Sequence, residues 1–79
     1  MNERLVVRQF VQQLLRAKGD SADVGDGDSL VVSGRLASID TLELVIFLEE
    51  QYGVDFAERG FDQYKLDSVD NIMTMIAGR

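Results

Sequence analysis

Ser38 is the residue best placed for covalent chemistry, because it stands at the predicted start of a helix rich in carboxylates. A serine there can cap the helix, since its hydroxyl oxygen accepts an otherwise unpaired backbone N–H of the first turn. The same position also suits a hydroxyl that bears a phosphate, because free N–H groups and the helix dipole stabilise an anion. Residue type and position alone leave both roles open.

Most catalytic chemistry is excluded by the residues that the chain lacks. It contains no histidine and no cysteine, so nucleophile–histidine pairs, histidine or thiolate metal sites and disulfides are impossible. Asp26 and Asp28 lie in a glycine-containing loop, but an EF-hand beginning at Asp26 would place Leu30 at a ligand position and Val31 where glycine is required. We therefore expect no catalytic residue, no metal site and no enzymatic activity.

Carboxylates are concentrated in the middle of the chain. Between positions 19 and 58 ten acidic residues accompany one base, Arg35, and the whole chain has a net charge of −6. This charge argues against nucleic-acid binding, which requires clustered lysine and arginine. It suits either a solvated acidic surface or a partner with a basic surface.

The helix that would position Ser38 is predicted over Ser38–Tyr52, and Gly53 is expected to end it. A core stripe at helical spacing contains Thr41, Leu44, Val45, Leu48 and Tyr52. The opposite face mixes three large apolar residues with three carboxylates, namely Ile39, Leu42 and Ile46 with Glu43, Glu49 and Glu50. Such a face is typical of an interaction site, although a central helix buried on most of its surface would give the same pattern.

Two further helices are predicted around this one. The first spans Leu5–Ala17 and ends before Gly19, and the last begins with a cap at Asp67 or Ser68. Their apolar faces are Val6, Val7, Phe10, Val11, Leu14 and Ala17 in the first, and Val69, Ile72, Met73 and Ile76 in the last. One short helical turn is expected near Phe61–Tyr64.

These elements predict an all-α fold, a small three-to-four-helix bundle with a long loop between the first and second helices. The chain has 79 residues and no proline, which suits one helical domain. Within residues 19–37 we expect apolar side chains to hold the loop on the helices, namely Leu30, Val31, Val32 and Leu36. No apolar run is long enough to span a bilayer and the first residues lack a signal-peptide layout, so a cytoplasmic location without membrane insertion is expected.

Two segments have the order and spacing of a known family. They are Ser33-Gly34-Arg35-Leu36-Ala37-Ser38-Ile39-Asp40-Thr41-Leu42-Glu43-Leu44-Val45-Ile46-Phe47-Leu48-Glu49-Glu50-Gln51-Tyr52-Gly53-Val54-Asp55-Phe56 and Leu66-Asp67-Ser68-Val69-Asp70-Asn71-Ile72. With the preceding helix and acidic loop, they resemble acyl carrier proteins over nearly the whole chain. The resemblance implies an acyl-carrier-like fold and a single carrier domain over residues 1–79. The run Ser33–Leu36 is closer to stand-alone aminoacyl and other specialised carriers than to the typical fatty-acid carrier.

The resemblance also implies a cofactor. In that family the serine just before the acidic helix receives 4'-phosphopantetheine from coenzyme A, and the matching position is Ser38. The arm then holds an acyl or aminoacyl group as a thioester, as in fatty acid or secondary metabolite biosynthesis.

Partners follow from the same resemblance. The family's acidic helix docks on basic patches of the enzymes it serves, which gives that role to Ile39, Leu42, Glu43, Ile46, Glu49 and Glu50. The implied partners are a phosphopantetheinyl transferase, an acyl- or aminoacyl-loading ligase, and downstream synthases or transferases. The carrier itself is expected to be a monomer.

One position departs from the family pattern. The family usually has aspartate immediately before the serine, where it is thought to help the transferase engage, and this chain has Ala37. Two classes of function therefore stay open: a covalent carrier, and an unmodified carrier-like interaction module. Ala37 beside an intact Ser38 is the feature that separates them.

Overall fold

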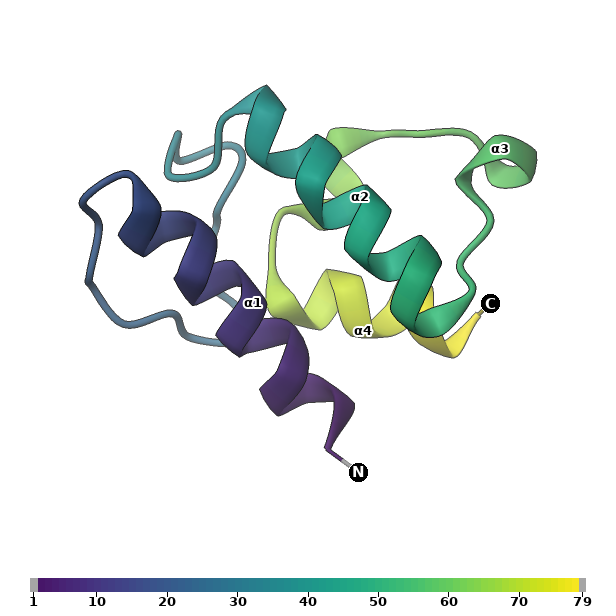
Figure 1. The fold of residues 1–79 in the computed structure, drawn as a ribbon, viewed down its shortest axis with the longest axis horizontal. Helices are drawn as coiled ribbons and strands as arrows, with labels where there is room; N and C mark the ends of the chain where they lie inside the picture. The colour runs from purple at the N-terminus through teal and green to yellow at the C-terminus, as the bar shows by residue number, and fades with distance from the viewer. Residues whose placement is uncertain (1, 79) are drawn as a thin grey trace.

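Three helices of two turns or more, α1 (Glu3–Ala17), α2 (Ser38–Tyr52) and α4 (Val69–Ala77), build the fold. Two four-residue segments, the helix α3 (Phe56–Arg59) and the 3₁₀ helix η1 (Gln63–Leu66), lie between α2 and α4. The computed structural model describes residues 2–78, without the side chain of Arg59. In Figure 1, α1 and α2 lie at a similar tilt but run in opposite chain directions, α4 lies crosswise to both, and the connection over residues 18–37 loops around one side. The predicted all-α bundle with a long first loop is confirmed.

α1 packs on α4 through one ridge of apolar side chains. The helix begins at an Asn2 cap, whose side chain accepts the Leu5 N–H at 3.2 Å. Its fully buried residues are Val7, Val11 and Leu15, each four positions from the next. The predicted face omitted Leu15 and included Ala17, which is exposed. The prediction was wrong here because the neighbouring helix contacts the four-residue ridge rather than the centre of the apolar sector.

α2 has the predicted bounds and the predicted core stripe. Gly53 ends it in the left-handed conformation, at φ +67°, where a side chain would be strained. Thr41, Leu44 and Leu48 are buried, while Val45 and Tyr52 are partly buried against the core. The position of α2 on α1 is set by Phe10 of α1 and Phe47, whose rings stack with centroids 4.1 Å apart.

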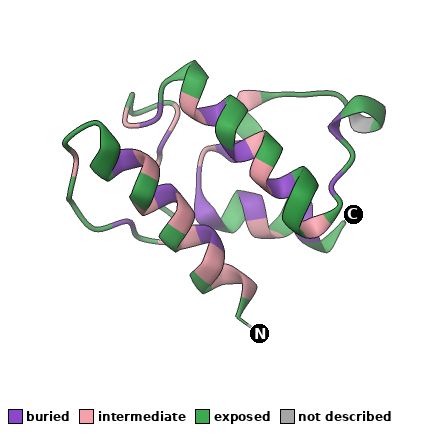
Figure 2. Ribbon diagram, viewed as in Figure 1, coloured by how far each residue is buried: buried purple, intermediate pink, exposed green. Residues whose placement is uncertain are grey.

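α4 packs on α1 and η1 and completes the core. Ser68 is its N-cap, and the Ser68 hydroxyl accepts the Asn71 N–H at 3.1 Å, as one of the two predicted caps requires. Val69, Ile72 and Ile76 are buried as predicted, but Met73 is only partly buried and Met75 takes the remaining buried position. Figure 2 shows the buried positions facing inward where the three long helices meet.

The long loop is held on the helices at separate points. Val24, Leu30 and Leu36 enter the core, and Val31 packs against it. Val32 was also expected to hold the loop, but it is 71% exposed. Its place is taken by a polar anchor: the Asp67 carboxylate accepts the N–H groups of Val31 and Val32 at 2.8 and 2.9 Å.

The segment between α2 and α4 contains two short helices rather than one. Asp55 caps α3 by accepting the Glu58 N–H, and Asp62 caps η1 by accepting the Tyr64 N–H, both at 3.0 Å. The predicted single turn near Phe61–Tyr64 therefore overlaps only η1, because two local aspartate caps start two separate turns. Among the described residues, no helix has the length and apolar character needed to cross a membrane.

Candidate functional site

Ser38 is the first residue of α2, and it is exposed. The residue in the cap position is Ala37, which has extended backbone and offers no side-chain cap. The Ser38 hydroxyl lies 3.5 Å from the side-chain oxygen of Gln63, a distance too long for a strong hydrogen bond. Ser38 therefore does not cap the helix, and its hydroxyl lies at the surface of the first turn.

The first turn of α2 is fastened by Asp40 instead. Its Oδ2 accepts the backbone N–H of Ala37 at 2.8 Å, which is the reverse half of a capping box. The same oxygen accepts from Lys18 Nζ at 2.7 Å, and Lys18 Nζ also donates to the Arg35 carbonyl at 2.9 Å. Burial alone would raise the pKa of the Asp40 carboxyl, but Lys18 and the Ala37 N–H outweigh it and hold the pKa below its usual range.

Sequence reasoning missed this group, which we call the Lys18 clasp and define as Lys18, Asp40, the Arg35 carbonyl and the Ala37 N–H. Lys18 and Asp40 are 22 positions apart, so no local periodicity links them. The one available signal was an acidic residue three positions after the cap, which is the capping-box spacing.

Arg35 fixes the loop that leads to Ser38. Its guanidinium binds the Asp20 carboxylate with both Nε and Nη2, at 3.0 and 3.3 Å, and also donates to the carbonyls of Ala22 and Asp23. This hydrogen bonding lowers the pKa of Asp20 and raises the pKa of Arg35. Arg35, the one base of the acidic segment, is therefore bound within the protein. Most of the surrounding carboxylates are exposed at the surface.

The predicted mixed face of α2 is exposed. Ile39, Leu42 and Ile46 are 65, 50 and 54% exposed, so a helix buried on most of its surface is ruled out. Glu43, Glu49 and Glu50 are exposed beside them. In Figure 2, buried, intermediate and exposed positions alternate along α2. Ser38 and all six predicted partner-binding residues thus belong to one helix, and we call these six residues the acidic-apolar stripe.

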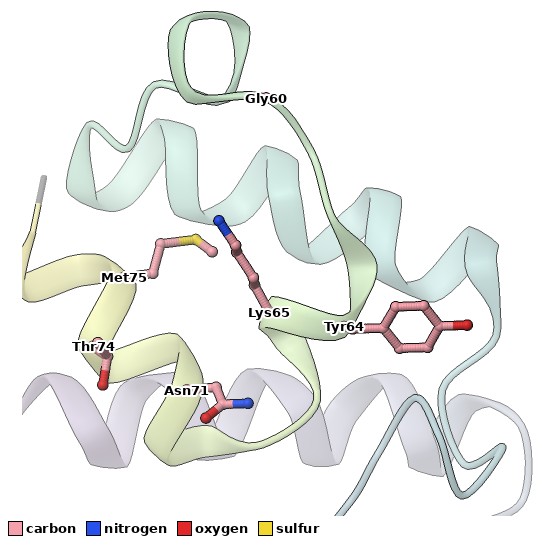
Figure 3. Close-up of a pocket in the computed structure, with 6 residues that line it drawn as sticks. All are labelled: Gly60, Tyr64, Lys65, Asn71, Thr74 and Met75. Carbon is pink, nitrogen blue, oxygen red and sulfur yellow. The ribbon is translucent and has the colours of Figure 1, made fainter.

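An open pocket of about 490 Å³ lies between η1 and α4. Figure 3 shows its lining: Gly60 from the loop after α3, Tyr64 and Lys65 from η1, and Asn71, Thr74 and Met75 from α4. The Lys65 side chain extends toward Gly60, whereas the Tyr64 ring points away from the other lining side chains. None of the described residues that line it is a carboxylate, and its titratable groups are Tyr64 and Lys65.

The described residues contain no group of three carboxylates that could hold a metal ion. Fold and site together define a small helical protein that presents an exposed serine at the head of a helix with an acidic and apolar outer face. Comparison of the chain with protein-family models, with curated proteins and with solved structures found no match in any of the three. The resemblance to acyl carrier proteins rests on the residues quoted above.

Proposed function

We propose that this protein is a carrier that bears 4'-phosphopantetheine on Ser38 and presents an acyl or aminoacyl group to partner enzymes as a thioester. The observation that carries the proposal is the setting of the Ser38 hydroxyl. It is exposed, it does not cap its helix, and it lies directly before the acidic-apolar stripe. The arm supplies a terminal thiol when bound, and the protein supplies the attachment point and the docking surface.

The start of α2 fits a phosphate on Ser38. The N–H groups of Ser38 and Ile39 belong to the first turn, where no intrahelical acceptor exists, and no side-chain cap satisfies them. A phosphodiester on the Ser38 oxygen would meet these donors and the positive end of the helix dipole. The nearest carboxylate in the turn, Asp40, is already paired with Lys18, which reduces its repulsion of the phosphate.

The acidic-apolar stripe supports docking on basic enzymes. Exposed carboxylates steer a basic surface toward the helix, and the three apolar side chains between them supply area that can be buried on contact. Partners of this kind are the phosphopantetheinyl transferase that would load the arm, a ligase that would charge it, and the synthases or transferases that would use the thioester. A net charge of −6 opposes nucleic-acid binding.

A second candidate is an unmodified interaction module with the same docking helix. It is favoured by Ala37, which stands where related carriers usually have the aspartate that helps the transferase. Both candidates use the acidic-apolar stripe, and they differ only in whether Ser38 is modified.

The test is the intact mass of the purified protein before and after incubation with coenzyme A, Mg²⁺ and a broad-specificity phosphopantetheinyl transferase. We expect one added phosphopantetheine, located on the peptide that contains Ser38, and none in Ser38→Ala. Ser21→Ala is the matched control, because Ser21 is an exposed loop serine whose side chain makes no hydrogen bond among the described residues, and it should leave the modification intact. An adduct on another residue, or no adduct with several transferases, would exclude the carrier function and favour the unmodified module.

A further inference from the structure

We infer that Lys18 is a positioning residue for Ser38. Its ammonium group joins the end of α1 to both sides of the serine, to the Arg35 carbonyl before it and to the Asp40 carboxylate after it, at 2.9 and 2.7 Å. Asp40 transmits the constraint to the Ala37 N–H at 2.8 Å. The predicted effect on modification rests on the proposed function, whereas the effect on backbone order does not.

The clasp matters because it ties the segment around Ser38 to the end of α1. The other supports lie within the loop and α2: Arg35 is bound to Asp20, and the Thr41 hydroxyl donates to the Ser38 carbonyl at 2.6 Å. Leu36 and Thr41 are buried, but Ala37, Ser38 and Ile39 between them are exposed. Ala37 provides no side-chain cap, so the Asp40 carboxylate must fasten the turn. The Asp40 side chain is 13% exposed, and a carboxylate that has lost so much solvent needs a cation close by. Lys18 is that cation.

Loss of Lys18 should therefore loosen the start of α2 without unfolding the protein. Lys18 is itself 36% exposed and contributes no side chain to the buried core. A transferase would then meet the ordered serine segment in only a fraction of molecules, and its apparent affinity would fall by that fraction. The expected signature is a raised KM for the carrier with little change in kcat, since the bound serine is the same.

The first experiment measures hydrogen exchange at the Ala37 amide by NMR in Lys18→Met, Lys18→Arg and wild type. We expect exchange to be about 3- to 10-fold faster in Lys18→Met, the effect of one modest charge-assisted contact, and near wild type in Lys18→Arg. Arg16→Met is the matched control. It removes the same charge from the same end of α1, and the exposed Arg16 side chain makes no hydrogen bond or ion pair among the described residues. Equal exchange in Lys18→Met and wild type would overturn the inference.

The second experiment measures transferase kinetics on the same four proteins. We expect KM for the carrier to rise about 3- to 10-fold in Lys18→Met only, with rescue in Lys18→Arg. If wild type is modified and Lys18→Met has an unchanged KM, the role in presenting Ser38 fails while the carrier function stands. If wild type is not modified at all, the carrier function fails, and the exchange measurement still decides whether Lys18 orders the segment.

Discussion

At the scale of single residues, Asp67 joins two distant parts of the chain. Its Oδ1 accepts two loop N–H groups and also the Ser29 hydroxyl at 3.1 Å, and its backbone carbonyl accepts the Leu30 N–H at 2.6 Å. Burial alone would raise the pKa of this carboxyl, but the Val32 and Val31 N–H groups and Ser29 hold it below the usual range. Asp67 thus holds the loop beside the start of α4 through both its carboxylate and its backbone carbonyl.

Asp67→Ala should lower the free energy of unfolding by about 1 to 3 kcal/mol, because it leaves two partly buried donors, the Ser29 hydroxyl and the Val31 N–H, without their acceptor. Urea denaturation followed by circular dichroism measures the change. Asp23→Ala is the matched control, an exposed loop aspartate whose side chain has no partner among the described residues, and it should change stability by less than about 0.5 kcal/mol. Equal effects of the two substitutions would show that Asp67 is not the anchor.

At the scale of elements, α2 has two faces with separate roles. The inner face packs on α1 and η1, and the outer face presents the acidic-apolar stripe next to Ser38. The Phe10–Phe47 stack fixes the rotation of α2 and therefore which residues face outward. Substitutions on the outer face should affect binding rather than folding.

Reversing Glu43 and Glu50 to lysine should slow modification of Ser38 by a transferase about 10-fold or more, because complementary charge mainly raises association rate. The melting temperature should change by no more than a few degrees, since exposed charges contribute little to stability. The control is the reversal of Asp23 and Glu58, which changes the net charge equally but lies outside α2. An equal slowing in both double variants would point to net charge rather than to this face.

The bounds and both faces of α2 were predictable from the sequence, because each depends on local spacing and on one terminal glycine. The split between α3 and η1 was not, since single aspartates capping four-residue turns leave no periodic pattern. Leu15 and Met75 were missed for another reason: which edge of an apolar sector is most buried depends on the helix packed against it. The Lys18 clasp also required tertiary structure, because it joins positions 18, 35 and 40 across a loop.

At the scale of the whole molecule, acidic side chains stabilise a fold that carries net negative charge. Asp20, Asp40 and Asp67 each have a lowered pKa and each hold a loop or helix end. Arg4 pairs with Asp26 at 3.0 Å and with Asp70 at 2.5 Å, and Arg8 also pairs with Asp26. These ion pairs join α1 to the loop and to α4. Interactions of this kind require ionised carboxylates.

Acid should therefore destabilise the protein. A carboxyl whose folded pKa is lower than its unfolded value of about 3.9 contributes its full stabilisation above that value and loses it as pH falls through the folded pKa. Relief of self-repulsion opposes this effect only as far as the isoelectric point near 4.3. We expect the free energy of unfolding in urea to vary little between pH 7 and pH 5 and to fall below about pH 4.

The pH series should be repeated on Asp67→Ala, which lacks one of the three lowered carboxyls and should lose less stability on acidification. A wild-type protein as stable at pH 3 as at pH 7 would contradict the role given to these carboxylates.

The packing of α1 on α4 has a consequence for how the chain acquires its structure. The Arg4–Asp70 ion pair spans 66 positions, and the buried ridge of α1 faces the last helix described. On a ribosome α1 emerges long before α4, so the packing of its apolar ridge on α4 must wait until nearly all of the described chain has been synthesised. We therefore expect the core to be completed late, with Val7, Val11 and Leu15 of the nascent chain incompletely buried in the interval.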